Sequence, residues 1–201
     1  MDNIYLKHGR RMFVKRNTVI YEQGTTGNEV YILVEGKIKI SMDVFNRKER
    51  IIEILGNGQV FGEQILDQSS YFSSACTLEN SVIYQFDYSK YRELMIKDKS
   101  FQDLFYNSMI TKLKHLGNII QLKSLSAEEQ LANSLLEISC KYNSNEIPLN
   151  QQQLSNYTGL TRITIYKIIK EWQECNLLTK KRGKLCIENS AYLQSYVSVF
   201  L

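Results

Sequence analysis

Proline, histidine and long apolar runs are scarce in this chain of 201 residues. One proline and ten glycines exclude collagen-like and low-complexity architectures. No run of about 18 apolar residues is present, so no membrane-spanning helix and no membrane partner are expected. The first residues lack the charged-then-apolar layout of a secretion signal, which predicts a cytoplasmic protein. Two histidines, His8 and His115, are too few and too far apart for an all-histidine metal site, so no metal is expected.

The cysteines are few and widely spaced. Cys76, Cys140, Cys175 and Cys186 form no C-x-x-C pair. In a cytosolic protein this favours reduced thiols that pack as small hydrophobic side chains. A disulfide or a thiol sensor is the alternative, and Cys175 with Cys186 is then the expected pair. Hydrophobic residues make up 43% of the chain and charged ones 23%, a composition that excludes disorder.

The first half of the chain alternates between short apolar runs and glycine-bearing turns. Strands are predicted at residues 19–21, 29–34, 37–42, 47–55 and 81–86. Turns at Gly24, Gly36 and Gly56-Asn57-Gly58 separate them. Many short strands with little helix indicate a β-barrel or jelly-roll packing.

Two segments of this half resemble a known family. They are Tyr31–Ile38, with the sequence YILVEGKI, and Gly58–Glu63, with the sequence GQVFGE. Both are similar to the effector-binding β-roll of the Crp-Fnr transcription regulators. The resemblance implies an α+β protein whose residues 1–98 form a double-stranded β-roll of the cupin-like jelly-roll type. For members that bind cyclic AMP, it implies a glutamate on the ribose hydroxyl and an Arg-Ser pair about ten residues later on the cyclic phosphate.

The phosphate-binding part of this pattern is missing. Phe72 stands at the arginine position beside Ser73, and no arginine lies between Arg50 and Arg92. A buried phosphate without a cation is strongly disfavoured, so cyclic AMP is not expected to bind and no cofactor is predicted. The effector, if one exists, is left unidentified by the sequence.

An effector pocket in the roll is nevertheless a candidate site. Its residues are Glu63, Tyr71, Phe72 and Ser73. The two aromatic rings suit an apolar or aromatic effector, whereas in the alternative interpretation both rings fill the core of the roll and Glu63 is only a structural hydrogen-bond partner. An iron-sulfur sensor is excluded because the first cysteine is Cys76, far from the N-terminus.

A long proline-free helix is predicted over about residues 100–123, within a segment 99–124 that we assign to a dimerisation helix and hinge. Its apolar residues recur at alternating spacings of three and four, as in a coiled-coil seam. The seam consists of Tyr106, Met109, Leu113, Leu116 and Ile120. Such a stripe is also typical of ordinary core; the family resemblance implies a parallel helix pair and therefore a homodimer.

Residues 125–201 have the layout of a winged helix-turn-helix. Ser126 and Glu129 fit a capping box that begins a helix ending at about Tyr142. A short helix at 151–157, a turn at 158–160 and a second helix at 161–172 follow. The inward residues of the second helix are Ile165, Ile168, Ile169 and Trp172. Two strands around Arg182-Gly183 are predicted to form the wing.

Positive charge is concentrated in this part of the chain. Residues 162–184 contain seven basic and two acidic residues, a net charge of +5, whereas the whole chain carries +4. A basic run alone is often only a solvated face. Beside a groove-sized helix and a wing, it predicts a surface that contacts DNA phosphates.

The segment Gly159–Ile168, GLTRITIYKI, also resembles the Crp-Fnr family, whose pattern is G-x-[ST]-R-x-T-[VI]-x-[RK]-[IV]. By this resemblance Arg162 reads guanine, because a guanidinium fits the O6 and N7 acceptors of that base. Thr161 and Thr164 are then phosphate contacts, and Lys167 is a phosphate or base contact. Many members have glutamate at Ile163; isoleucine instead suits a thymine methyl group, which predicts a different half-site at that base pair.

The full set of DNA-binding candidates extends to the wing and to the first helix of the motif, whose Gln151 or Gln152 anchors on the backbone. It comprises Gln151, Gln152, Thr161, Arg162, Ile163, Thr164, Tyr166, Lys167, Lys181 and Arg182.

These patterns predict a homodimeric transcription regulator that binds a palindromic double-stranded DNA operator, with half-sites about 34 Å apart. RNA polymerase is a further partner if the protein is an activator. A cupin-type oxygenase is the enzymatic rival, but no histidine lies between His8 and His115, so no catalytic residues are assigned. A regulatory module that docks a partner protein and has lost DNA binding is the second rival.

Overall fold

The computed structural model describes residues 7–44, 48–67 and 69–197 of the chain. They form two compact units, Met1–His115 and Leu116–Leu201. The fold is mixed α and β with antiparallel sheets in both units, which confirms the predicted α+β class. Residue 47, the predicted first residue of one strand, lies outside the described residues. No helix in the described part of the chain is long and apolar enough to span a membrane.

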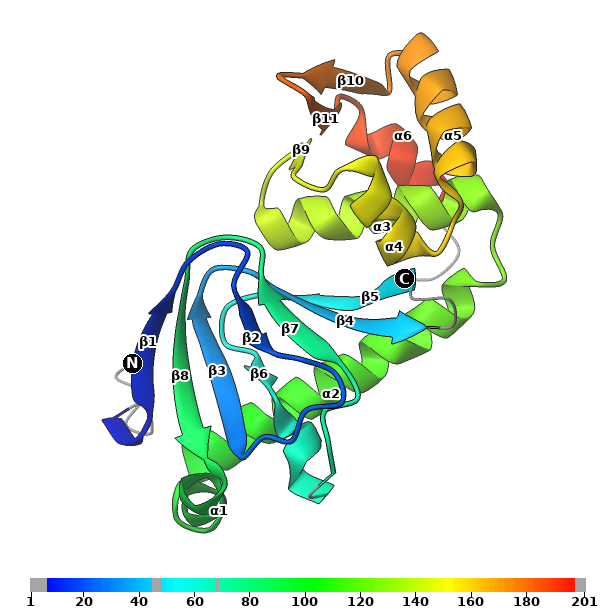
Figure 1. The fold of residues 1–201 in the computed structure, drawn as a ribbon. Helices are drawn as coiled ribbons and strands as arrows, with labels where there is room; N and C mark the ends of the chain where they lie inside the picture. The colour runs from blue at the N-terminus through cyan, green and yellow to red at the C-terminus, as the bar shows by residue number, and fades with distance from the viewer. Residues whose placement is uncertain (1–6, 45–47, 68, 198–201) are drawn as a thin grey trace. The chain divides into compact units, whose positions relative to one another are not determined.

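The first unit is a β-roll made of two four-stranded sheets (Figure 1). The first sheet has the order β1-β8-β3-β6, and the second has the order β2-β7-β4-β5. The strands are β1 (Arg10–Val14), β2 (Val19–Tyr21), β3 (Glu29–Glu35), β4 (Ile38–Val44), β5 (Lys48–Leu55), β6 (Val60–Phe61), β7 (Ser74–Thr77) and β8 (Ser81–Asp87). A short 3-10 helix, η3 (Glu63–Asp67), follows β6. The observed strands β2, β3, β4, β5 and β8 therefore begin and end within two residues of their predicted bounds.

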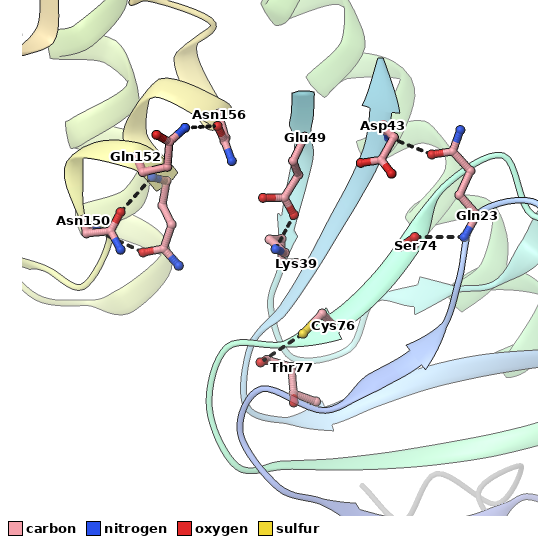
Figure 2. Close-up of polar contacts among 11 residues, drawn as sticks. Gln23, Lys39, Asp43, Glu49, Ser74, Cys76, Thr77, Asn150, Gln152 and Asn156 are labelled. Carbon is pink, nitrogen blue, oxygen red and sulfur yellow. Dashed lines mark hydrogen bonds and ion pairs between the residues drawn. The ribbon is translucent and has the colours of Figure 1, made fainter. Parts of the chain in front are cut away.

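Alternation of side chains places the core between the two sheets. In β4, Ile38 and Ile40 are buried. Lys39 between them is only partly buried and forms an ion pair with Glu49 of the neighbouring strand β5. Polar contacts also connect neighbouring strands: the Gln23 amide oxygen accepts a hydrogen bond from the backbone N–H of Asp43 (2.7 Å), and the backbone N–H of Gln23 donates to Ser74 (2.9 Å) (Figure 2).

Two helices follow the roll. Helix α1 (Tyr88–Lys97) begins at Asp87, whose carboxylate caps the helix by accepting from the backbone N–H of Lys90. Helix α2 (Lys99–Leu122) is the long helix predicted from the sequence. Phe101 and Phe105 of α2 are buried in the apolar cluster of the roll, so the first half of this helix is part of that core.

In the second unit, helices α3 to α6 accompany a small sheet that lies at one side of them (Figure 1). Its elements are α3 (Ala127–Tyr142), β9 (Glu146–Ile147), α4 (Gln151–Thr158), α5 (Arg162–Glu174), β10 (Leu178–Lys181), β11 (Lys184–Ile187) and α6 (Ser190–Ser195). The capping box of Ser126 with Glu129 is present at the start of α3, as predicted. The sheet order is β10-β11-β9, and the β10–β11 hairpin is the predicted wing.

Candidate nucleic-acid interface

Helix α4 is fixed at its start by reciprocal side-chain contacts. Asn150 accepts from the backbone N–H of Gln153 (2.9 Å), and the Gln153 side chain accepts from the backbone N–H of Asn150 (3.0 Å). The side-chain amide of Gln152, in the same turn, donates to the side chain of Asn156 one turn further along α4 (2.8 Å) (Figure 2). Gln152 is exposed and Gln151 half-buried, so both predicted backbone anchors lie at the accessible N-terminal turn of α4.

The turn between α4 and α5 requires a left-handed residue. Gly159 ends α4 with φ +79°, a conformation that costs glycine nothing sterically. The Ser155 hydroxyl donates to the carbonyl of Leu160 (2.7 Å), and the Thr158 hydroxyl accepts from the Leu160 N–H (3.1 Å). These bonds hold the turn and therefore the direction in which α5 leaves it.

Helix α5 has one apolar face and one exposed face. Thr161 caps its N-terminus by accepting from the backbone N–H of Thr164 (3.1 Å), and the two threonine hydroxyls also share a hydrogen bond (2.8 Å). The buried side chains are Ile165, Ile168, Ile169 and Trp172, the set predicted from the sequence. The bond between the two hydroxyls uses one of their two protons, so one hydroxyl keeps an O–H that can donate to a phosphate oxygen.

The opposite face of α5 presents the base-reading candidates. Ile163 is 69% exposed and Tyr166 is 55% exposed, although both are large and apolar or aromatic. Arg162 and Lys167 are exposed too, and neither makes an ion pair with any residue that the structure describes. Exposed apolar side chains beside unpaired cations are what a surface that contacts base methyl groups and phosphates needs.

A cleft of about 750 Å³ lies between α4, α5 and the wing. Arg162, Tyr166 and Gln151 line it, and so do Lys170 and Lys180, which were not among the predicted site residues. A smaller hollow of about 370 Å³ is lined by Gln151, Arg162, Ile163 and Tyr166. The position of Lys180 on β10 could have been read from the basic run, but its place beside α5 depends on the fold of the hairpin.

The wing turns at two residues with positive φ. Arg182 has φ +49° and Gly183 φ +81°, as a two-residue hairpin turn requires. Of the predicted wing contacts, Arg182 is exposed at the tip, whereas Lys181 forms an ion pair with Glu188 (2.6 Å). This hydrogen bond raises the pKa of Lys181 and lowers the pKa of the Glu188 carboxyl.

A second carboxylate acts on the wing in the same way. Lys184 forms an ion pair with Glu146 of β9 (3.0 Å), and the hydrogen bond lowers the pKa of the Glu146 carboxyl. Two of the four wing cations are thus already neutralised by the protein's own carboxylates.

The candidate effector residues of the roll separate into inner and outer ones. Ser73 is fully buried, and its hydroxyl accepts from the Gln64 amide (2.6 Å). Tyr71 is 2% exposed, and its hydroxyl donates to the carbonyl of Glu29 (3.2 Å). Phe72 is 58% exposed. The interpretation in which both rings fill the core is therefore right for Tyr71 and wrong for Phe72, because these two neighbouring side chains point to opposite sides of the segment that leads into β7.

Aromatic rings occupy the interior beside these residues. Tyr21 stacks on Tyr71 with ring centroids 4.0 Å apart, and Tyr31 stacks on Phe61 at 5.0 Å. Burial raises the pKa of Tyr71 to about 12, and burial together with the nearby Glu63 charge raises the pKa of Tyr21 as well. Both hydroxyls are therefore neutral at physiological pH.

Glu63 lies at the edge of this aromatic cluster. Its carboxylate forms an ion pair with Lys112 of α2, and both side chains are only 17% exposed. Its second oxygen, Oε2, is buried and has no hydrogen-bond partner in the described structure. The glutamate of the predicted pocket is thus held by a lysine of this same chain.

The apolar seam of α2 is exposed on one side. Tyr106, Leu113, Leu116 and Ile120 are between 46% and 72% exposed, whereas Met109 is half-buried and packs against the core of the roll. Ile110, 50% exposed, lies on the outer face instead. The sequence pattern did not separate these two residues. Met109 lies three residues after Tyr106 and Ile110 lies four residues after it, so both fit the alternating spacing of the seam.

The cysteines of this chain do not pair with one another. All four cysteines are free thiols; Cys175 is exposed and Cys186 is buried in β11. Burial raises the pKa of the half-buried Cys76. Among the residues that the structure describes, no cluster of three or more His, Cys, Asp or Glu side chains could hold a metal ion.

Comparison with known protein families gives two matches. The profile of the cyclic nucleotide-binding domain matches residues 11–98, and that of the Crp-like helix-turn-helix domain matches residues 129–196. A CRP-like cAMP-activated global transcriptional regulator of Mycobacterium tuberculosis is 22% identical over 189 residues, 90% of this chain and 81% of the relative. The fumarate and nitrate reduction regulatory protein of Shigella dysenteriae is 23% identical over 94% of this chain and 78% of the relative.

Solved structures share the fold. A CRP/FNR-family transcriptional regulator from Thermus thermophilus superposes with a TM-score of 0.83 at 16% identity, over 93% of this chain and 97% of that one. The c-di-GMP-responsive global regulator CLP of Xanthomonas campestris superposes with a TM-score of 0.81 at 16% identity, over 92% and 96%. The two family profiles, their order along the chain and the shared fold agree, and the chain is a member of the Crp-Fnr family of transcription regulators.

Proposed function

We propose that this regulator binds a palindromic DNA operator as a homodimer in the cytoplasm, with α5 in the major groove and the β10–β11 wing on the flanking backbone. The observation that carries the proposal is the exposed face of α5. There Arg162 and Lys167 have no ion-pair partner among the described residues, and Arg162 lines the cleft toward the wing. In this proposal Arg162 reads guanine, and Ile163 contacts a thymine methyl group.

The dimer part of the proposal rests on α2. Its outer face exposes large apolar side chains over several turns, which in water favours burial against an equivalent face. A pair of such helices is symmetric, so a two-fold operator follows from a two-fold protein. If the protein activates transcription, RNA polymerase is a further partner.

We further propose that cyclic AMP is not the effector. No arginine lies between Arg50 and Arg92, stacked rings occupy the roll interior, and Lys112 already pairs with Glu63. A cyclic phosphate would find no free cation there. Titration calorimetry with micromolar cyclic AMP should give no saturable heat, and a clear isotherm would contradict this part of the proposal.

Selection of bound duplexes from random DNA tests the whole proposal. Purified protein should enrich a two-fold sequence with half-sites about 34 Å apart, with an affinity that falls steeply as salt rises. Enrichment of no sequence, or binding that ignores salt, would favour the alternative of a protein-docking module that has lost DNA binding. That alternative is not favoured here, because the basic groove-facing residues are present and the helix-turn-helix profile matches.

A further inference from the structure

One face of α2 holds polar side chains that contact the roll. Ser108, Lys112 and His115 follow each other at spacings of four and three, so they lie on the same face of the helix. The contacts are Ser108 Oγ with the backbone N–H of Val60 (3.1 Å), Lys112 Nζ with the carboxylate of Glu63, and His115 Nε2 with the carbonyl of Ile52 (2.9 Å). This face of α2 is thereby attached to three different segments of the roll.

The ion pair is the contact of the three that joins two oppositely charged side chains. Glu63 and Lys112 are each 17% exposed, so solvent screens their attraction only weakly. Breaking such a pair from one side leaves an uncompensated buried charge, which is costly. Glu63 is also the residue that, by family resemblance, would meet an effector. In this chain the carboxylate of Glu63 instead forms an ion pair with Lys112 of α2.

The apolar seam lies on the neighbouring face of the same helix. Leu113 follows Lys112 and is rotated from it by about 100° around the helix axis, and it is 67% exposed. The rotation of α2 on the roll therefore decides which apolar side chains face outward. Any contact that fixes this rotation also fixes the surface offered to a second copy.

We propose that the Glu63–Lys112 ion pair is a built-in substitute for an effector: it fixes the rotation of α2 on the roll and thereby presents the apolar seam for dimerisation without any ligand. The inference rests on the proposed dimer. It predicts that dimerisation, and with it operator affinity, depends on this pair and needs no added small molecule.

The chain offers a matched control for the test. Lys114 lies two residues from Lys112 on the same helix; it is exposed and makes no ion pair with the described residues. Lys112→Met should raise the dimer dissociation constant, measured by analytical ultracentrifugation, by about tenfold or more, whereas Lys114→Met should change it by less than about twofold. Hydrogen exchange should also speed up in α2 residues 104–115 of the Lys112→Met protein only. Equal behaviour of the two variants would overturn the proposal.

Two double variants separate positioning from the cost of a lone charge. Lys112→Met combined with Glu63→Gln leaves no charge unpaired; the dimer should stay about tenfold weaker if the pair positions the helix, and wild-type affinity in this variant would overturn the proposal. The charge reversal Glu63→Lys with Lys112→Glu should recover affinity to within about threefold of wild type. A reversal that stays as weak as Lys112→Met contradicts the role of the pair.

Failure of the proposed function has a different signature. If the wild-type chain is monomeric at all concentrations, or binds no operator, the proposed function fails whatever the variants do. If the wild-type chain dimerises and binds its operator but Lys112→Met matches Lys114→Met, only the further inference fails.

Discussion

Arg162 is the residue on which sequence recognition depends most. It follows the cap residue Thr161 directly, so its guanidinium leaves the helix at the N-terminal turn, the part of a recognition helix that reaches base edges. No carboxylate in the described structure competes for it. Tyr71 shows the opposite situation, because its position decides packing: its ring is 2% exposed and leaves no room for a side chain at Gly27.

The first prediction concerns base reading. Arg162→Ala should cost about 1–3 kcal/mol of binding free energy at one guanine of each half-site and little at the other positions. Arg162→Lys should recover part of the affinity but not the discrimination, because an ammonium cannot make the bidentate contact. Competition binding with single-base operator variants measures this. A loss that is uniform across all bases would show that Arg162 contacts phosphate only.

The second prediction concerns the aromatic stack. A Cβ at Gly27 would lie 2.2 to 2.4 Å from atoms of the Tyr71 ring and hydroxyl, so Gly27→Ala should lower the free energy of unfolding by about 1–3 kcal/mol. Gly56→Ala is the matched control, since the nearest atom to its Cβ would be 3.8 Å away. Urea denaturation of both variants gives the comparison, and equal stabilities would contradict the packing described for Tyr71.

Among the elements, the β10–β11 wing carries cations that suit DNA, but carboxylates of the protein already pair with some of them. Its hairpin carries four cations, of which Lys181 pairs with Glu188 and Lys184 pairs with Glu146. Each carboxylate competes with DNA phosphate for its lysine. The basic run in the sequence therefore overstates the charge that the wing offers to DNA, and only the pairing of β11 with β9 places Glu146 beside Lys184.

The third prediction follows from this competition. Glu188→Gln frees Lys181, so the affinity for DNA of any sequence should rise at low salt, and the slope of log K against log salt should steepen by about one. The specificity ratio should not improve, because phosphate contacts carry no base information. Glu22→Gln, at an exposed residue of the roll unit, changes the net charge by the same amount and serves as the control. Equal salt slopes for the two variants would contradict a role for Lys181 at the interface.

At the scale of the whole molecule, the chain consists of two compact units, and α2 begins in the first and ends in the second. Both profiles of the family match one unit each. Since α2 exposes its apolar seam along much of its length, the proposed dimer axis and the link between the units are parts of one element.

The fourth prediction tests that dimer directly. Leu113→Glu places a charge in the seam, and the dimer dissociation constant should rise about tenfold to hundredfold, from the lost burial of one leucine. Affinity for a full operator should fall more than affinity for a single half-site. Ile96→Glu on α1, where the side chain is 74% exposed, is the control. A Leu113→Glu protein that remains dimeric would place the interface elsewhere.

Local signals in the sequence were sufficient for most elements. Alternation in β4, the capping box at Ser126 and the glycine in the turn after α4 act over a few residues, so they are visible without the fold. The capping box at Asn150 is equally local but was not predicted. The long-range partners were not visible. Lys112 and Glu63 are 49 residues apart in sequence, and nothing in either segment indicates the other.

By itself, the sequence determined the order of the two domains, the helix-turn-helix, the apolar seam of α2 and the absence of an arginine between Arg50 and Arg92, because each depends on local periodicity or on residue type. The tertiary structure decided which side of each segment is covered. It buried Tyr71 and exposed Phe72, packed the half-buried Met109 against the core of the roll while Ile110 stayed exposed, and gave Glu63 a lysine as its partner. Those outcomes depend on chain segments that meet only after folding, because burial and ion pairing are properties of the packed structure.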